Sequence, residues 1–394
     1  MKKAIIIIPT YNEKDNVPVV IPALMEVFKK VTNWDLQILI VDDTSPDKTY
    51  EVVKDLQKKN PKLHLLLNKQ KAGLGGAYLK GMEYAFNQLK ADVVFEFDAD
   101  MSHDPQKIPQ FLKKIEQGYD FVLGSRYIAG GSIPDDWGLS RKFLSVFGNI
   151  IIMTVLTDFR IRDWTTGYRA ITKEVYQAVY KELGSQRFSG YTFQIGFLHK
   201  AVRKGFKITE VPINFVDRTK GHSKLGNEYI KNTLLYILKV RIEEIINNRI
   251  FKFAFVGGIG TLVQLTSLML FRKLLPEFTY LFLTTFLVST LLSIELAILS
   301  NFTLNNLWTF ADRKLKLAQL PSKFIQFNIA SMGSILIQLV INFLGEAVIG
   351  LHQLFVLPII KLSIDTGLIF AMTGIIIGLF WNFFAYNHFI WKKS

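Results

Sequence analysis

Long apolar runs in the last third of the chain constrain its fold more than any other feature. From Ile250 to the C-terminus, apolar stretches of about 20 residues alternate with short polar segments, and a helix of this length crosses the hydrocarbon core of a bilayer. Up to about Asn248 the sequence carries the frequent charges of a soluble α/β chain. We therefore expect membrane-spanning helices at Ile250–Leu270, Tyr280–Ser300, Phe324–Val348 and Thr366–Phe389.

Basic residues are distributed unevenly around these expected spans. The segment from Asp312 to Lys323 and the Lys392–Lys393 end are basic, whereas Leu351–Ile360 contains no Lys or Arg. Because Lys and Arg are retained in the cytosol, both termini and the loop 301–323 are predicted to be cytosolic. Met1–Lys3 leads directly into an apolar strand too short for a secretory signal. We expect an integral, multi-pass membrane protein with a cytosolic N-terminal domain.

Overall charge narrows the class of partners. The chain of 394 residues has a formal net charge of +14, which favours lipid headgroups, nucleotides and phosphorylated substrates. No nucleic-acid-binding motif is present and many Lys residues lie beside apolar spans, so no nucleic-acid partner is expected. The absence of cysteine excludes a disulfide-stapled fold and little else.

Strand and helix patterns alternate in the N-terminal part. Apolar strands are expected at Ala4–Ile8, Leu36–Val41, His64–Leu67 and Val93–Phe97, with helical patterns between them. Continuous apolar strands of this kind are buried on both faces of a parallel sheet. The alternation predicts a right-handed, mostly parallel sheet with helices on both faces.

Two carboxylates follow the fourth strand. Asp98 and Asp100 are two positions apart, so they point to the same side of an extended chain, at the end where parallel sheets open a ligand crevice. Adjacent carboxylates repel each other unless a cation or proton lies between them. Carboxylates with room for water suit Mg²⁺ or Mn²⁺, which commonly bridge to phosphates. For an isolated DxD, a solvated acidic turn or a helix cap is the alternative.

Seven short motifs follow one another along the chain: Pro9–Glu13, Val41–Asp47, Lys71–Gly81, Asp98–Pro105, Gly124–Ser132, Asp163–Arg169 and Arg218–Leu225. They occur in the order seen in glycosyltransferase family 2, and together they resemble the dolichol-phosphate mannose synthases of that family. Chance is implausible for seven ordered motifs, so the acidic-turn alternative for the DxD is discarded. The resemblance implies a GT-A-type (Rossmann-like) α/β domain over residues 1–226. Gly196 departs from the family pattern, which has an acidic residue there.

The resemblance also implies roles for individual residues. Asp98, Asp100, Arg126 and Asp163 would be catalytic, with Asp163 aligning the sugar or shaping the pocket. Mg²⁺ or Mn²⁺ would be held by Asp98, Asp100 and Ser102. The acceptor phosphate would be bound by Arg126, Arg141 and Ser145. The sugar-nucleotide donor would be bound by Pro9, Tyr11, Glu13, Val41, Asp43, Asp98, Ala99, Asp100, Arg126, Arg218 and Lys224.

The loop that carries Arg218 and Lys224 is expected to be flexible because it contains Gly221. We expect it to fold over the donor diphosphate after binding. The alternative is a solvated basic linker.

Two helical segments have an apolar side and a polar side. Leu139–Thr157 and the segment 227–248, with its helix at Asn227–Asn247, are expected to lie in the membrane interface. A core helix of a soluble domain is the alternative for each. The interface placement is favoured because an enzyme with a lipid acceptor must meet it at the bilayer surface.

The C-terminal part, residues 249–394, resembles the four-span GtrA-like family in Phe251–Gly258, Asn301–Phe310 and the final NHFIW. This resemblance leaves anchoring, oligomerisation and movement of a lipid-linked sugar open. Glu295, within a span, is a functional candidate, and its alternative is a carboxylate bonded to nearby Asn or Ser groups. Lys361 and Asp365 are expected to form an ion pair.

The implied reaction is metal-dependent, inverting transfer of mannose from GDP-mannose to dolichyl (polyprenyl) phosphate, releasing GDP. A phosphate monoester is largely dianionic at neutral pH, so the nucleophile needs no general base. Transfer from UDP-glucose or another sugar nucleotide is the nearest alternative. A processive polysaccharide synthase is disfavoured because no Q-x-x-R-W motif is present. A non-catalytic lipid carrier or scaffold is the alternative of another class.

Overall fold

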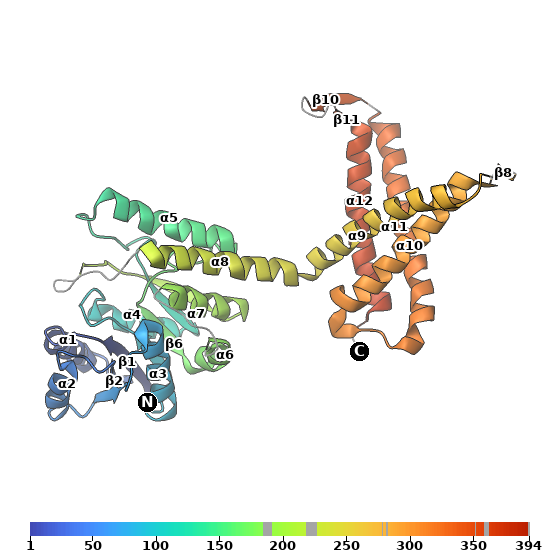
Figure 1. The fold of residues 1–394 in the computed structure, drawn as a ribbon. Coiled ribbons are helices and arrows are strands. Elements are labelled where there is room, and N and C mark those ends of the chain that lie inside the picture. The colour runs from blue at the N-terminus through green and yellow to red at the C-terminus, as the bar shows by residue number, and fades with distance from the viewer. Residues whose placement is uncertain are drawn as a thin grey trace. The chain divides into compact units, whose positions relative to one another are not determined.

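The computed structural model describes residues 1–183, 191–217, 227–277, 279–280, 283–350, 352–357 and 362–392. The chain forms two compact units, Met1–Arg241 and Ile242–Ser394, which are considered one after the other (Figure 1).

A seven-stranded sheet lies at the centre of the first unit, in the order β3-β2-β1-β4-β6-β5-β7. β6 is antiparallel to its neighbours β4 and β5, and the other pairs are parallel. The predicted mostly parallel sheet is therefore confirmed. The strands are β1 (Lys2–Thr10), β2 (Trp34–Asp42), β3 (Leu63–Leu67), β4 (Val93–Glu96), β5 (Phe121–Ser125), β6 (Arg169–Thr172) and β7 (Ile208–Pro212).

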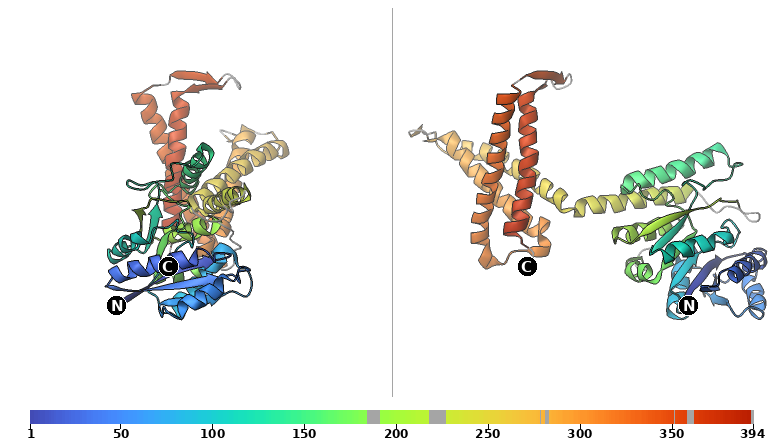
Figure 2. Two further views of the ribbon diagram at one scale, coloured as in Figure 1. Left: turned by 90° about the vertical axis from the view of Figure 1, so that its left-hand side faces the viewer. Right: turned by 180° about the vertical axis from the view of Figure 1, so that it is seen from behind.

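Helices cover both faces of this sheet (Figure 2). Successive β1 side chains alternate between the two cores, with Ile5 and Ile7 in one and Ala4, Ile6 and Ile8 in the other, as the two-residue repeat of a strand requires. The second core contains residues of α1 (Val17–Lys30), α2 (Thr49–Gln57) and α4 (Ile108–Glu116), and η1 (Pro105–Lys107) directly precedes α4. The first contains α3 (Gly73–Asn87), α5 (Leu139–Leu156), α6 (Lys173–Leu183), α7 (Tyr191–Arg203) and α8 (Asn227–Asn247).

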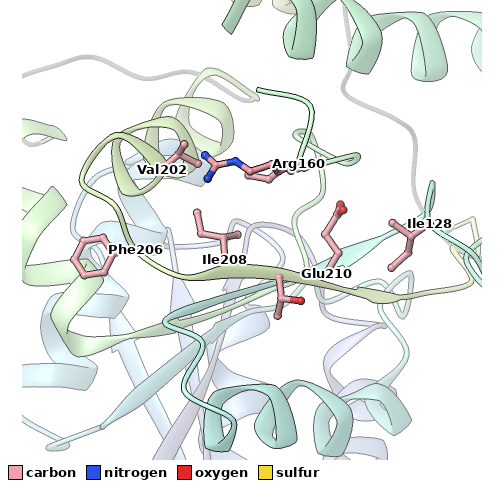
Figure 3. Close-up of a pocket in the computed structure, with 8 residues that line it drawn as sticks. Ile128, Arg160, Val202, Phe206, Ile208 and Glu210 are labelled. Atoms are coloured by element: carbon pink, nitrogen blue, oxygen red, sulfur yellow. The ribbon is translucent and has the colours of Figure 1, made fainter. Parts of the chain in front are cut away.

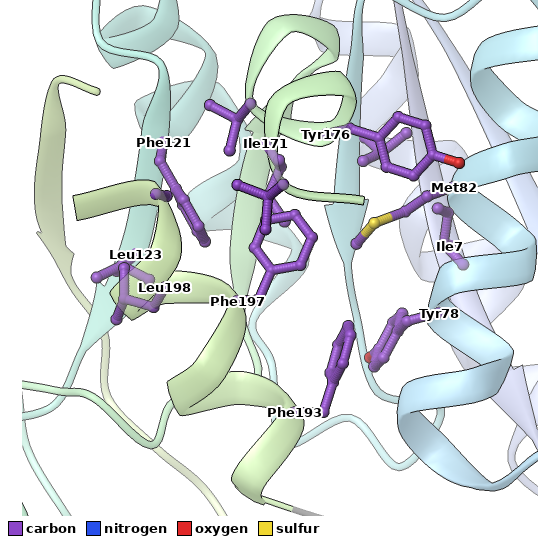
Figure 4. Close-up of a cluster of buried hydrophobic side chains, with 14 of the residues drawn as sticks. Ile7, Tyr78, Met82, Phe121, Leu123, Ile171, Tyr176, Phe193, Phe197 and Leu198 are labelled. Atoms are coloured by element: carbon purple, nitrogen blue, oxygen red, sulfur yellow. The ribbon is translucent and has the colours of Figure 1, made fainter. Parts of the chain in front are cut away.

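Helix α3 packs very closely on the sheet near the ends of β1 and β2. A Cβ atom on Gly81 would lie 2.7 Å from Ile7 Cγ2 and 3.0 Å from Val41 Cγ2, so only glycine permits this approach. Tyr78 and Met82 of the same helix point into the aromatic core with Phe193 of α7 (Figure 4). The glycines of this motif therefore serve packing, and they bring Tyr78 close to the end of β4.

Helix α5 leaves most of its apolar residues uncovered within the first unit. Phe143 and Phe147 are exposed, and with Ile230 of α8 they line an open apolar groove. α5 and α8 lie side by side (Figures 1 and 2). The length and hydropathy of α5 also suit a membrane span. Its placement at a membrane interface remains a prediction.

The second unit contains four long helices near the predicted spans. The second helix begins at Thr285 rather than Tyr280, because a short hairpin of β8 (Thr279–Tyr280) and β9 (Leu283–Thr284) precedes it. Glu295 lies in this helix with an exposed side chain. Lys361 lies outside the described residues. The remaining elements are α9 (Arg249–Leu274), α10 (Thr285–Leu304), η2 (Asn305–Thr309), η3 (Ala311–Arg313), η4 (Leu317–Gln319), α11 (Leu320–Val348), β10 (Gln353–Leu357), β11 (Leu362–Asp365), α12 (Thr366–Ala385) and η5 (Tyr386–Ile390).

The helix pairs α9–α10 and α11–α12 end in related sequences. Asn301–Phe310 and Asn382–Trp391 share the pattern N-F-x-x-x-N-x-aromatic-x-aromatic. Both segments pass from α-helix into a π-helical turn, and in both the final backbone N–H donates to the carbonyl five residues earlier. The final rings, Phe310 and Trp391, stack on each other with centroids 4.5 Å apart. The second unit is thus built from two similar helical hairpins joined at this aromatic stack.

Candidate active site

Three loops meet where β1, β2 and β4 end. Pro9 pairs with Val41 in the sheet register, and Ile7 pairs with Glu96, so the segments after these strands are neighbours. Four non-glycine residues, Asn12, Thr44, Lys48 and Met101, adopt a left-handed backbone conformation in these loops, with φ of 59°, 54°, 63° and 62°. Such conformations cost roughly 1–3 kcal/mol each and gather at functional sites. These loops at the sheet edge are therefore candidates for an active site.

Asp43 connects β2 to the beginning of α3. Its carboxylate accepts a hydrogen bond from Asn68 Nδ2 at 2.7 Å and from the backbone N–H groups of Ala72 and Gly73 at 2.9 and 3.2 Å. A carboxylate offers roughly four acceptor positions, so about one is left for a ligand. Asp43 is thus both a structural link and a potential acceptor for a nucleoside.

Tyr11 and Glu13 lie in the loop after β1. The Lys71 ammonium lies 3.7 Å from the centroid of the Tyr11 ring, which places a cation over the aromatic face. Glu13 accepts from Asn16 Nδ2 at 2.6 Å, and its backbone N–H donates to Thr49 Oγ1. The predicted donor residues are thus held by α1, α2 and the segment before α3. The sequence interpretation gave Lys71 no role.

The DxD segment forms a tight turn directly after β4. Asp98 accepts from Tyr78 OH at 3.2 Å and leaves 39% of its side chain exposed. Asp100 Oδ1 accepts from the backbone N–H of Ser102 at 3.1 Å. Ala99 and Ser102 are buried. The negative charges of Asp98 and Asp100 both act on the neighbouring His103, and each raises its pKa.

His103 was not identified as a site residue from the sequence, although it lies within the Asp98–Pro105 motif. Its ring is buried, stacks on Tyr168 with centroids 4.8 Å apart and meets Phe97 edge-on. His103 Nδ1 accepts the backbone N–H of Asp98 at 3.1 Å, and Nε2 lies 3.6 Å from Asp98 Oδ2. Burial lowers its pKa more than the two carboxylates raise it. The His103 imidazole is therefore neutral, carries its proton on Nε2, and helps to hold Asp98 in place.

A buried ion pair lies next to the DxD segment. Glu96 and Arg169 face each other across β4 and β6, with Arg169 Nε 3.8 Å from Glu96 Oε2. Burial raises the pKa of Glu96 to about 7 and lowers that of Arg169 to about 10. Arg169 also donates to the carbonyls of Thr166, Gln194 and Trp164. Gly196 is buried two residues beyond Gln194. This pair was also missed by sequence reasoning.

Arg126 and Asp163 form a two-pronged ion pair. Arg126 Nε and Nη2 donate to the two carboxylate oxygens at 2.7 and 2.8 Å, and Nη2 also donates to Thr165 Oγ1 at 2.8 Å. The Arg126 side chain is 9% exposed and that of Asp163 is fully buried. The sequence indicated both residues individually, and the structure brings them into contact.

Glu210 of β7 supports this pair from the backbone side. Its carboxylate accepts the backbone N–H groups of Arg162 and Asp163 at 3.1 and 2.9 Å. Burial raises its pKa. Glu210 lines a cavity of about 310 Å³ together with Arg160, Ile128 and other residues. Figure 3 shows these side chains around the cavity. Nothing in the sequence pattern marked Glu210.

Two of the predicted acceptor residues, Arg141 and Ser145, lie on α5. Arg141 donates from both terminal nitrogens to Asp217 at 2.7 and 2.8 Å, and its guanidinium lies over the Trp137 ring. Ser145 shares a hydrogen bond with Tyr127 OH. Tyr127 follows Arg126 in the chain, so this hydrogen bond connects Ser145 to the residue next to Arg126, the third predicted acceptor residue. The other two predicted cations, Arg218 and Lys224, lie outside the described residues.

Metal binding at this edge would depend on few protein ligands. Within the described ranges no cluster of three or more His, Cys, Asp or Glu side chains forms. Two carboxylates, both partly exposed, still match the protein share of a Mg²⁺ site, which usually keeps waters and substrate phosphates as its other ligands. The residues present therefore fit a divalent ion shared with a phosphorylated ligand.

Comparison with known proteins decides the family. The model of glycosyl transferase family 2 matches residues 5–179, and that of the GtrA/DPMS transmembrane domain matches residues 252–391. The dolichol-phosphate mannosyltransferase of Pyrococcus furiosus is 32% identical over 358 residues, covering 89% of this chain and 93% of the relative. This chain belongs to glycosyl transferase family 2. Both resemblances noted in its sequence are thereby confirmed.

Two further relatives match part of this family 2 glycosyltransferase. The polyprenol monophosphomannose synthase of Mycolicibacterium smegmatis is 35% identical over 237 residues, or 60% of this chain and 86% of the relative. The undecaprenyl-phosphate mannosyltransferase of Micrococcus luteus is 32% identical over 237 residues, or 60% and 93%. The glycosyltransferase is a membrane protein, since its second unit is a GtrA/DPMS transmembrane domain. The number of spans remains a prediction.

Proposed function

We propose that this glycosyltransferase moves mannose from GDP-mannose to dolichyl (polyprenyl) phosphate at the cytosolic face of the membrane. The products would be polyprenyl-phosphate β-mannose and GDP. One observation carries the proposal: the relative that matches along nearly the whole chain is named for mannosyl transfer to dolichol phosphate. The two further relatives are also named for mannose and polyprenol.

The donor end of the proposed site is the edge formed by β1, β2 and β4. Tyr11 and Asp43 would bind the nucleoside, with Pro9, Glu13 and Val41 shaping its pocket. Asp98 and Asp100, with Ser102, would hold Mg²⁺ or Mn²⁺, and such an ion supplies neutralisation of charge on the departing diphosphate. His103 and Tyr78 keep Asp98 in place through the bonds already described.

Binding of the acceptor phosphate would depend on how strongly Arg141 and Arg126 are held by their own carboxylate partners. Arg141 is 46% exposed, and an exposed ion pair such as Arg141–Asp217 contributes only about 0.2–1 kcal/mol, so a dianionic phosphate can displace Asp217. Arg126 differs, because breaking a buried pair costs about 3–5 kcal/mol, and it stays with Asp163. Arg141 would therefore bind the phosphate directly, while Arg126 would provide a guanidinium in a fixed position.

The transfer step itself needs little from the protein beyond placement. The lipid phosphate is already deprotonated at neutral pH, so no side chain is assigned as a base. One phosphate oxygen forms a bond to the anomeric carbon as the bond to the GDP oxygen breaks, which inverts the anomeric configuration. Holding two anions together in this geometry is the main contribution of Arg126, Arg141 and Ser145.

A sugar-transfer assay tests the proposal. The full-length protein is incubated with polyprenyl phosphate in liposomes, Mg²⁺ or Mn²⁺, and radiolabelled GDP-mannose, UDP-glucose or UDP-GlcNAc. We expect labelled lipid from GDP-mannose alone. Label from a UDP-sugar would replace the donor, and no label from any donor would favour a carrier or scaffold.

A further inference from the structure

Helix α5 has one buried polar residue among its exposed apolar ones. Leu139 is 87% exposed, and Phe143, Phe147 and Ile150 are exposed as well. Asn149, by contrast, is 2% exposed. It lies four residues after Ser145 and eight after Arg141, so the three side chains share one helical face.

Both ends of the Asn149 carboxamide form hydrogen bonds to the loop that holds Asp163. Asn149 Oδ1 accepts the backbone N–H of Trp164 at 2.8 Å. Asn149 Nδ2 donates to Thr165 Oγ1 at 3.3 Å and to the carbonyl of Ser145 at 3.0 Å. The side chain therefore fixes this loop to the helix at two successive residues.

Thr165 carries the connection on to Arg126. Its hydroxyl accepts from Asn149 Nδ2 and from Arg126 Nη2, and it donates to Asp163 Oδ1 at 3.3 Å. A hydroxyl has one proton to donate and two lone pairs to accept, so this geometry uses its full capacity. A shift of Asn149 cannot occur without disturbing the hydrogen bonds of Arg126.

We infer that Asn149 is a positioning residue for the transfer step. It joins the α5 residues Arg141 and Ser145 to the Arg126–Asp163 pair as one rigid unit, so that all the acceptor-phosphate groups keep a fixed spacing. This inference rests on the proposed function, because it assigns the unit to the acceptor phosphate.

The chemistry of the amide makes the inference specific. An aspartate at position 149 keeps the acceptor for Trp164 N–H, but as a carboxylate it has no proton for Thr165 and adds negative charge near Asp163. An alanine leaves the Trp164 N–H without its partner. Neither change touches the donor loops at β1 and β2, so donor binding should be spared.

Kinetics of the full-length protein in liposomes test this role. We compare wild type, Asn149→Ala, Asn149→Asp and the control Thr154→Val, since Thr154 lies on the same helix and its hydroxyl donates to the carbonyl of Ile150 within that helix. A misplacement of about 1 Å can cost about 100-fold in rate. For both Asn149 variants we expect kcat/KM for polyprenyl phosphate to fall about 10- to 100-fold, with the GDP-mannose Kd within about twofold of wild type.

A second pair of variants separates positioning from folding. Thr165→Val removes the hydroxyl at nearly constant shape, whereas Thr165→Ser retains it. We expect the serine variant to transfer mannose at near the wild-type rate and the valine variant to lose activity as Asn149→Asp does. This pair decides the question if the Asn149 variants do not fold.

Three outcomes overturn the inference. They are wild-type kcat/KM in the Asn149 variants, equal losses of transfer and donor affinity, and equal activity of the two Thr165 variants. If wild-type protein transfers no sugar from any donor, the proposed function fails instead. An active wild type with equally active variants refutes only the role of Asn149.

Discussion

Arg126 and Asp163 lie 37 residues apart in the chain and form a two-pronged ion pair with N–O distances of 2.7 and 2.8 Å. Glu210 holds the Asp163 backbone from one side, and Thr165 accepts from Arg126 on the other. The guanidinium is therefore fixed before any substrate arrives, and the site does not spend binding energy on ordering it.

Removing the charge of Asp163 should destabilise the catalytic unit. Asp163→Asn leaves Arg126 buried without its counter-charge, and we expect the free energy of unfolding to fall by about 3–5 kcal/mol. Denaturant unfolding followed by circular dichroism measures this. Asp55→Asn is the control, because its pair with Lys58 is exposed and should contribute nothing measurable. Equal stability of both variants would contradict the buried pair.

Removing Asp100 should stop transfer without unfolding the protein. Asp100 is partly exposed and accepts the backbone N–H of Ser102, two residues away, so Asp100→Ala should keep its melting temperature and membrane association. We expect transfer to fall at least about 10²–10³-fold, the scale seen when one group that stabilises developing charge is lost. Asp104→Asn in the same loop should remain active, since Asp104 caps η1. Near-normal turnover of Asp100→Ala would remove the metal assignment.

Arg141 and Asp217 should have opposite effects on acceptor use. Arg141→Ala removes the cation, so we expect the KM for polyprenyl phosphate to rise while that for GDP-mannose stays constant. Asp217→Asn removes the competing carboxylate, and the acceptor KM should fall or stay level. Initial rates over a matrix of both substrate concentrations give both constants. An effect of Arg141→Ala confined to the donor refutes its acceptor role.

Stability should depend on pH through Glu96. Burial raises the pKa of Glu96 from 4.5 to about 7, so between these values the folded protein binds a proton that the unfolded chain releases. The contribution of Glu96 to stability is therefore greatest below pH 4.5 and declines as the pH rises to 7.

Glu96→Gln removes this dependence. Relative to wild type, the variant should gain about 3 kcal/mol between pH 4.5 and pH 8, as the difference of about 2.5 pKa units implies. Unfolding free energies of both proteins across this range provide the measurement. A constant difference between the two proteins would mean that Glu96 does not titrate there.

The sequence alone determined the layers of the fold and the positions of the motifs. The apolar strands, the helices between them and the four long C-terminal helices were predicted because each depends on the spacing of apolar residues within a short stretch. The location of Asp98 and Asp43 at strand ends followed from the same local pattern. These features need no knowledge of which residues become neighbours.

Only the tertiary structure decided the partners of the site residues. That Arg126 binds Asp163, that Glu96 faces Arg169 and that Asn149 connects α5 to Thr165 depends on contacts between segments 16 to 73 positions apart in the sequence. A charged residue such as Arg126 is compatible with many partners, and periodicity carries no information about which one it meets. The choice is made when burial removes water and leaves each polar group only the partners that the packed strands and helices place within reach.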